Sequence, residues 1–208
     1  SGLETAVQTR RAENMVSGTD GINYKIQKAN RTDCKVQNLA VLIDKQALLR
    51  VHNRMKSNKA SGIDKMTKDE YDANLDRNLD NLVSRLKEDK YRPKPSRRVY
   101  IPKDGSRKMR PLGISSYEDK LVENVIADIL IPIYETKFIN TSYGFRPNRN
   151  CHMAIREIIE MVQYRKTNYI VEADIKGFFD NVNHEWLKKM IEYDIADRRF
   201  LRIIERFL

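Results

Sequence analysis

An apolar run that carries two acidic residues constrains this chain more than any other feature of its sequence. Residues 169–175 read YIVEADI, and their apolar and β-branched side chains predict a buried β-strand that ends before Gly177. Side chains alternate along a strand, so Glu172 and Asp174 share one face with Ile170. Burying a carboxylate is costly unless a cation or hydrogen bonds compensate. We therefore expect Asp174 to have a function at the end of this strand.

The size and composition indicate a folded chain with no membrane partner. It has 208 residues, of which 40% are hydrophobic and 33% charged, enough for a core. No apolar run approaches the ~20 residues that a bilayer requires, and no targeting peptide is recognisable. The two cysteines, Cys34 and Cys151, have no zinc-site spacing. We expect a reduced, cytoplasmic protein without structural zinc.

The charge is distributed unevenly along the chain. The formal net charge is +10, yet residues 1–110 carry 25 Lys and Arg against 14 Asp and Glu, whereas residues 111–208 carry 14 against 15. The excess is densest over residues 85–110, where 11 basic residues accompany 3 acidic ones. A solvated face is one interpretation. The other is a polyanion-binding surface, on which Lys and Arg displace counterions from phosphates.

The N-terminal half predicts a polar arm followed by helices. Residues 1–35 are polar, with one expected helix over 3–15. Apolar periodicity then predicts amphipathic helices over 35–56 and 67–89, separated by the loop SNKASGID at 57–64.

Residues 97–114 predict a basic β-hairpin. Asp104-Gly105 suits a tight turn between two strand-like arms, because such turns need positive φ. Four basic residues lie close together on its arms and turn: Lys103, Arg107, Lys108 and Arg110.

Three more helices are predicted downstream. The first covers residues 115–138; a capping box of Ser115 and Glu118 opens it, and Pro132 kinks or ends it. The second, at 151–165, is capped by Asn150 or Asn148. The third starts at about His184 after an Asn183 cap. The final segment, DRRFLRIIERFL, is amphipathic and ends on two large apolar residues, from which we expect a chain cut inside a domain.

Four blocks in a fixed order carry a family resemblance. They are SNKASGID (57–64), RPLGI (110–114), YGFRPNRN (143–150) and ADIKGFFDNV (173–182). Together they resemble the N-terminal half of a group II intron-encoded reverse transcriptase, the maturase family, over residues 39–208. Retron and diversity-generating reverse transcriptases are a less similar alternative.

The resemblance implies an α+β fold with the architecture of a right-hand polymerase. The expected parts are a basic N-terminal extension (1–35), helix-rich fingers with the basic β-hairpin (36–168) and an incomplete palm (169–208). The strand at 169–175 would be the first catalytic strand of this palm, and the palm would be truncated at its C-terminal side.

The resemblance also implies roles around Asp174. Nucleotidyl transfer uses two Mg²⁺ ions held by carboxylates and phosphate oxygens. Asp174 would be the first metal ligand, with the Ile175 carbonyl as a backbone ligand. The amides of Gly177 and Phe178 would face the triphosphate of the nucleotide. Phe179 would be the steric gate that rejects a 2′-hydroxyl, although either phenylalanine could instead be a core residue.

On the hairpin, Lys103 and Arg110 match the fingers residues that clamp the incoming dNTP. Two cations on opposite arms can meet around one phosphate group, and Arg offers a bidentate fork. A ribbon lying along the template backbone is the alternative, and it better explains Arg107 and Lys108. Arg146 either contacts template or nucleotide, or braces its loop through a palm carboxylate.

The chain lacks the Tyr-x-Asp-Asp block that supplies two more aspartates in the family. We expect this fragment not to polymerise and the full-length protein to do so, with RNA template, DNA primer and dNTP as substrates. We also expect apolar surface at the cut end to favour a homodimer.

The partner implied for this half is the group II intron RNA, whose splicing and retrohoming the full-length protein would assist. A non-enzymatic RNA-binding splicing cofactor is the alternative function. The candidate RNA contacts follow from charge and position: Lys25, Lys28, Arg31, Lys35, Arg50, Arg54, Lys56, Lys59, Arg107, Lys108 and Arg146.

Overall fold

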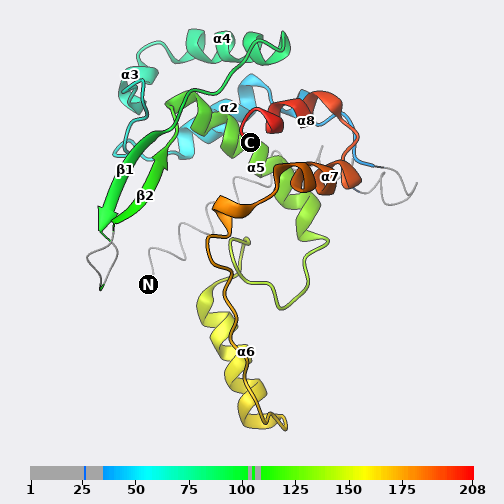
Figure 1. Cartoon of the computed structure of the whole chain (residues 1–208). Helices are drawn as coiled ribbons and strands as arrows, with labels where there is room; N and C mark the ends of the chain where they lie inside the picture. Colours follow the sequence, from blue (N-terminus) through cyan, green and yellow to red (C-terminus); the bar gives the residue numbers. More distant parts are fainter. Residues whose placement is uncertain (1–25, 27–34, 103–104, 106–108) are drawn as a thin grey trace. The chain divides into compact units, whose positions relative to one another are not determined.

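The computed structural model describes residue 26 and residues 35–102, 105 and 109–208 (Figure 1). This part is α+β, with a two-stranded antiparallel sheet among helices. Its elements, in chain order, are η1 (Ala40–Leu42), α2 (Lys45–Arg54), α3 (Lys68–Asp72), α4 (Leu75–Lys87), β1 (Arg97–Pro102), β2 (Met109–Ile114), α5 (Tyr117–Glu135), α6 (Cys151–Tyr164), η2 (Phe179–Asn181), α7 (His184–Asp194) and α8 (Arg198–Glu205).

The chain divides into two compact units. The first comprises Ser1–Val36 and Leu130–Ala196, and the second comprises Gln37–Ile129 and Asp197–Leu208. The expected helix over 3–15 lies outside the described residues.

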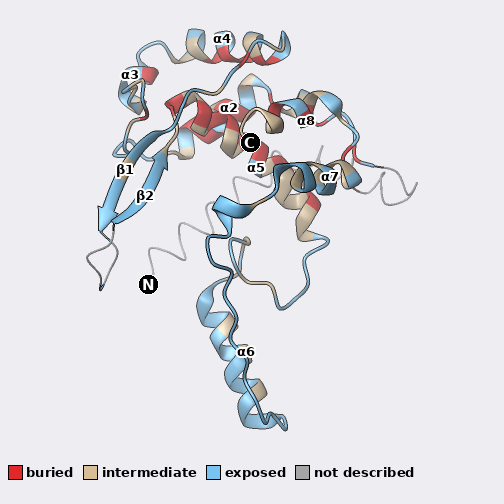
Figure 2. Cartoon of the chain, viewed as in Figure 1, coloured by how far each residue is buried: buried red, intermediate tan, exposed pale blue. Residues whose placement is uncertain are grey.

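The second unit has a packed apolar core. Figure 2 shows its buried residues on the inner faces of α2, α4, α5 and α8. Burying a Leu, Val or Phe side chain contributes about 1.5–3 kcal/mol each, which makes this core the main source of stability for the unit. Its most deeply buried members are Leu48, Val51, Leu79, Leu82, Leu121, Val122, Phe200 and Ile203.

The first two predicted helices are each interrupted once. The Asp44 carboxylate accepts a hydrogen bond from the Ala47 amide at 2.7 Å, so α2 starts there and not at residue 35. The second helix divides at Ala73–Asn74 into α3 and α4. The side-chain amide of Asn78 donates to the Tyr71 carbonyl at 3.0 Å, and the Asn74 amide donates to the same carbonyl at 3.4 Å, so this acceptor stays bonded across the break.

The predicted hairpin is confirmed. Strands β1 and β2 pair antiparallel, with Arg97 opposite Ile114 and Ile101 opposite Arg110. Gly105 has φ +72°, a conformation that glycine adopts without strain. Both strands are exposed along most of their length.

Helix α5 begins one residue later than the predicted cap. Ser116, and not Ser115, accepts the hydrogen bond from the Asp119 amide at 3.3 Å. Ser115 instead donates to Glu123 at 2.9 Å, so the predicted Ser115–Glu118 box is wrong. Pro132 lies inside the helix, which continues to Glu135.

Caps in the first unit follow the sequence. The Asn150 side chain accepts from the Met153 amide at 3.0 Å and starts α6, which settles the choice between Asn150 and Asn148. Asn183 accepts from the Trp186 amide at 3.0 Å and starts α7, as predicted.

The predicted buried strand at 169–175 is not formed. These residues have no regular secondary structure and are exposed, with 89% of Val171 and 68% of Ile175 accessible. A strand is stable when its N–H and C=O groups pair with a neighbouring strand, and no strand pairs with this segment in the described part of the chain. The apolar sequence therefore predicted a strand, but among the described residues no neighbouring strand pairs with it.

Candidate functional site

The loop that follows Asp174 is shaped by a tight turn at Gly177. This glycine has φ +60°, and its carbonyl accepts hydrogen bonds from the Asn181 amide at 3.1 Å and from the Asn181 side chain at 2.7 Å. A β-carbon at position 177 would lie 3.0 Å from the Asn181 side-chain nitrogen. The turn therefore favours glycine, and it leads directly into η2, where Asp180 lies as a turn residue.

Phe178 and Phe179 form a T-shaped pair with ring centroids 5.3 Å apart. The side chains are 51% and 79% exposed, so neither is a core residue within the described part of the chain. The alternative that one of them belongs to the core is not borne out there. Both rings are available to an external partner.

Asp174 is exposed and forms no hydrogen bond or ion pair with the described residues. The same residues contain no group of three or more His, Cys, Asp or Glu side chains that could hold a metal ion. Mg²⁺ is commonly bound by one or two carboxylates together with phosphate oxygens. Asp174 and the neighbouring Ile175 carbonyl fit part of such a site, and they do not form a complete metal centre on their own.

Arg110 lies on the exposed hairpin, opposite Ile101. The other predicted cations of this ribbon, Lys103, Arg107 and Lys108, lie outside the described residues, so their meeting with Arg110 stays a prediction. Arg110 and Asp174 belong to different compact units, and each site is therefore described separately.

The base of the hairpin is fixed to the loop at 57–64. The Arg97 guanidinium donates two hydrogen bonds to the Ser61 carbonyl, at 3.0 and 2.7 Å, and the Lys120 ammonium donates to the Ala60 carbonyl at 2.6 Å. The Lys94 ammonium pairs with Asp64 at 3.0 Å. Three cations thus hold a loop most of whose residues are exposed.

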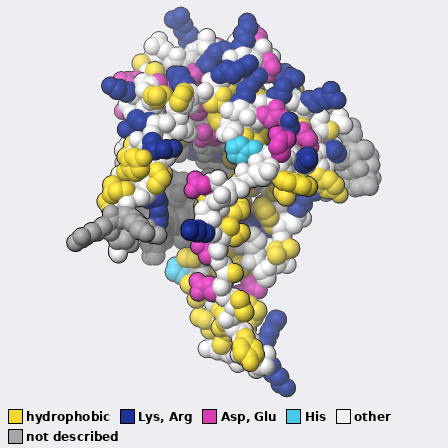
Figure 3. Space-filling model, in the orientation of Figure 1, with side chains coloured by type: hydrophobic (Ala, Val, Ile, Leu, Met, Phe, Trp, Pro, Cys, Tyr) yellow, Lys and Arg dark blue, Asp and Glu magenta, His cyan; other side chains and the backbone are white. Residues whose placement is uncertain are grey.

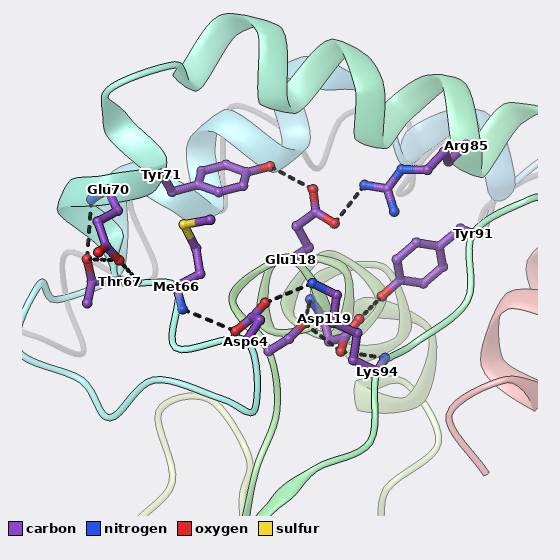
Figure 4. A network of polar contacts seen from close by, with 11 residues as sticks. Asp64, Met66, Thr67, Glu70, Tyr71, Arg85, Tyr91, Lys94, Glu118 and Asp119 are labelled. Carbon is purple, nitrogen blue, oxygen red and sulfur yellow. Dashed lines mark hydrogen bonds and ion pairs between the residues drawn. The ribbon is translucent and has the colours of Figure 1, made fainter.

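The buried carboxylate of Asp119 holds together the segments next to the base of the hairpin (Figure 4). Asp119 is 2% exposed and accepts hydrogen bonds from the Tyr91 hydroxyl, from the Ser116 hydroxyl at 2.6 Å and from the Lys94 amide at 3.0 Å. These bonds join the start of α5 to the segment between α4 and β1. Burial, followed by the bond to Asp119, raises the pKa of the Tyr91 hydroxyl, which keeps it a donor.

Two further polar links join α3, α4 and α5. Glu118 accepts from the Arg85 guanidinium at 2.6 Å and from the Tyr71 hydroxyl at 3.4 Å (Figure 4). His52 is 1% exposed and bridges the Tyr117 hydroxyl at 2.9 Å and the Asp72 carboxylate at 2.8 Å. His52 is thus a buried, hydrogen-bonded residue of the core. No periodic pattern in the sequence predicts this network, because its members come from four separate segments.

Several predicted RNA contacts already have protein partners. The Lys35 ammonium donates to the Glu192 carbonyl at 2.7 Å. Arg54 makes a bidentate ion pair with Asp128, with N–O distances of 2.8 and 2.7 Å, and its side chain is only 18% exposed. Both cations therefore stabilise the fold, and Arg54 has little surface left for RNA.

Other predicted contacts remain accessible. Arg50, Lys56 and Lys59 are exposed and have no ion-pair partner among the described residues. Lys25, Lys28 and Arg31 lie outside the described residues.

Arg146 braces its own loop. Its Nε and Nη2 atoms each donate to Glu135 at 3.0 Å, and its Nη1 atom donates to the carbonyls of Ile139 and Ser142 at 2.9 and 2.8 Å. The side chain is 6% exposed. This geometry favours bracing over RNA contact, and the carboxylate involved belongs to the end of α5 and not to the predicted palm.

Comparison with known proteins identifies relatives that match the part of the chain containing these segments. The family model described as "Reverse transcriptase (RNA-dependent DNA polymerase)" matches residues 101–208, which include both Arg110 and Asp174. The chain is 38% identical over 157 residues to the group II intron-encoded protein LtrA of Lactococcus lactis subsp. cremoris, covering 76% of this chain and 26% of that protein. It is 37% identical over 146 residues to protein YkfC of Escherichia coli K12, covering 69% and 38%.

A mitochondrial relative is similar over a shorter stretch. Nuclear intron maturase 1 of Arabidopsis thaliana is 30% identical over 92 residues, which cover 44% of this chain and 13% of that protein. The chain thus spans about a quarter of the length of LtrA and less than two fifths of YkfC. Among the described helices, none has the length and hydropathy needed to cross a membrane.

Proposed function

Because the chain belongs to the reverse transcriptase family and is similar to group II intron-encoded proteins, we propose that the full-length protein is an RNA-directed DNA polymerase and intron maturase. It binds its own group II intron RNA, assists splicing and copies the intron during retrohoming. RNA template, DNA primer and dNTP are its substrates.

The observation that carries this proposal is the span of the family match. Residues 101–208 contain the arm of the hairpin that bears Arg110 and the Asp174–Phe179 loop in one continuous match. A module that only binds RNA has no chemical need for an exposed carboxylate next to a glycine turn and two accessible phenylalanines. A polymerase needs all three of these features around a nucleotide.

Each feature then has a proposed role. Asp174 and the Ile175 carbonyl hold Mg²⁺, which lowers the charge on the reacting phosphate oxygens when further carboxylates of the full-length protein complete the site. The Gly177 and Phe178 amides face the triphosphate, and Phe179 packs under the sugar as the steric gate. Lys103 and Arg110 clamp the triphosphate from the hairpin.

The domain division is part of the same proposal. Residues 1–35 form the N-terminal extension, 36–168 the fingers and 169–208 the start of the palm. Exposure of the 169–175 segment supports this division, since a palm strand is stable only next to its neighbouring strands.

The test measures binding of this chain to its cognate intron RNA and to an unrelated structured RNA of equal length across a salt series. Preferential binding of the cognate RNA at moderate salt is expected. Equal binding of both RNAs with a steep salt slope would show that the positive charge binds polyanions without specificity. Primer extension by the full-length protein separates the polymerase from a splicing cofactor without enzymatic activity.

A further inference from the structure

The tertiary structure brings a second basic segment to the end of helix α4. The Arg199 guanidinium in α8 donates to the Leu86 carbonyl at 3.3 Å across a separation of 113 residues. Both segments, 85–94 and 197–206, belong to the same compact unit. Together they contain nine basic and four acidic residues. Figure 3 shows Lys and Arg side chains gathered over the region of α4 and α8.

Part of this charge stabilises the end of α4. Arg206 donates to the Asp89 and Tyr91 carbonyls at 3.1 and 3.0 Å, and Arg92 donates to the same two carbonyls at 2.9 and 2.8 Å. These carbonyls lie in the segment that follows α4, so the two arginines bind the chain where it leaves the helix. Arg92, Arg199 and Arg206 are therefore explained by the fold.

Four other cations are not explained in this way. Lys87 and Arg198 are exposed and have no ion-pair partner among the residues that the structure describes. Lys90 is 72% exposed and pairs only with Glu88, and Arg202 is 52% exposed, with its Nε atom 3.6 Å from Asp89. Exposed pairs of this kind are screened by solvent and hold their partners weakly. We call Lys87, Lys90, Arg198 and Arg202 the α4–α8 basic surface.

Two of the nearby acids, Asp89 and Asp197, have closer partners outside this surface. Asp89 pairs with Arg206 at 2.7 Å, and Asp197 accepts hydrogen bonds from the amides of Arg199 and Phe200 at 3.0 Å each as the cap of α8. The large hydrophobic residues of both segments point inward, for example Leu86, Tyr91 and Phe200. The surface therefore offers positive charge without an apolar patch, which suits a polyanion and not an apolar protein face.

We propose that the α4–α8 basic surface binds the phosphate backbone of structured RNA. This inference rests on the proposed function and adds a contact site separate from the predicted RNA contacts. Arg198 and Arg202 lie one helical turn apart on the same face of α8, so two cations can contact one RNA strand together. Contacts of this kind fix position on the RNA and carry no base sequence information.

The experiment compares three forms of the chain. One carries Lys87→Gln, Arg198→Gln and Arg202→Gln. The matched control carries Arg77→Gln, Lys166→Gln and Lys189→Gln, which remove the same charge from exposed positions elsewhere. Binding of a labelled RNA stem-loop is measured across a salt series, and urea unfolding checks that all three forms fold.

The surface variant is expected to lose about tenfold in affinity and roughly one unit of salt slope for each lost phosphate contact, whereas the control retains most of both. If the unsubstituted chain binds RNA and the two variants bind alike, the surface proposal is overturned and the proposed function stands. If the unsubstituted chain binds no RNA, the proposed function fails and this inference fails with it.

A second measurement uses the unsubstituted chain only. Lys87 and Lys90 are expected to be protected from acetylation when the stem-loop is bound, as read by mass spectrometry. Equal acetylation of both lysines with and without saturating RNA would contradict the proposal, regardless of how the variants fold.

Discussion

Gly62 lies against the backbone of Ser116 so closely that a β-carbon at position 62 would be 2.6 Å from the Ser116 Cα atom. The Ser115 carbonyl oxygen and the Ser116 nitrogen would be 2.7 and 2.8 Å away. The contact joins the 57–64 loop to the start of α5. It gives a physical reason for the glycine of the SNKASGID block, since any other residue would have to displace backbone atoms.

We expect Gly62→Ala to lower the free energy of unfolding by about 3 kcal/mol, because backbone cannot yield to the added methyl group as a flexible side chain can. Urea unfolding measures the change. Gly113→Ala is the control: its β-carbon would lie 3.6 Å from the Ser96 β-carbon, an ordinary contact. Equal stability of the two variants would contradict the close packing of Gly62.

Tyr91→Phe removes one donor from the buried Asp119 carboxylate and leaves its charge less compensated. We expect a loss of about 1–3 kcal/mol in the free energy of unfolding. Tyr100→Phe is the matched control, because Tyr100 is 56% exposed and its hydroxyl has no partner among the described residues. A Tyr91→Phe variant as stable as the control would exclude a structural role for the Asp119 network.

Glu123 should make stability fall with rising pH. Burial raises the pKa of this carboxyl above its ordinary value of 4.5, against the opposing hydrogen bond from Ser115. From that value up to the raised pKa, the folded state keeps a proton that the unfolded state has lost, so the free energy of unfolding decreases as pH rises. Glu123→Gln removes this loss. In urea unfolding across this pH range, the free energy of unfolding of the variant should therefore rise relative to that of the unsubstituted chain.

Glu70 provides the opposite sign as a comparison. Hydrogen bonds from the Thr67 amide, and then from its hydroxyl, lower the pKa of Glu70 below 4.5. The contribution of Glu70 to stability is present above the pKa of the unfolded state, and it is lost as the pH falls through the lower pKa of the folded state. Glu70→Gln should therefore lose stability relative to the unsubstituted chain as pH rises. The same slope in both variants would show that neither carboxyl controls the profile.

Arg146→Lys should loosen the loop between α5 and α6. A lysine cannot reproduce the bidentate contact with Glu135 and the two carbonyl contacts at once. We expect faster amide hydrogen exchange over residues 139–149, with α6 unaffected. Arg156→Lys, at an exposed position of α6, should leave the exchange unchanged. Unaltered exchange in the Arg146 variant would mean that the brace does not hold the loop.

Asp174→Asn should abolish polymerisation by the full-length protein, with a loss of about a thousandfold or more in rate, because the proposed metal ligand loses its negative charge. Binding of intron RNA should be retained. Primer extension and RNA binding are measured on the same preparation. Full polymerisation by the variant would remove Asp174 from the catalytic site and leave RNA binding as a separate question.

Local features were decided by the sequence alone. The Asn183 cap and the pairing of the hairpin were predicted correctly, and the cap of α6 was narrowed to Asn150 or Asn148, because each depends on residues a few positions apart. The turn at Gly177 is also a local feature, since it depends on hydrogen bonds between residues 177 and 181. Short-range hydrogen bonds and backbone preferences fix such features before any long-range packing occurs.

Tertiary structure decided what depends on partners far away in the chain. The cap at Ser116 lies beside Asp119, whose buried carboxylate is bound by Tyr91 and by the Lys94 amide from a distant segment. The 169–175 segment shows that an apolar sequence forms a strand only beside another strand. The same holds for charge. The sequence shows how many cations the chain has. Only the tertiary structure shows that Arg54 and Arg146 are held in ion pairs, whereas the cations of the α4–α8 basic surface stay accessible. The reason is that an ion pair depends on distance in space and not along the chain.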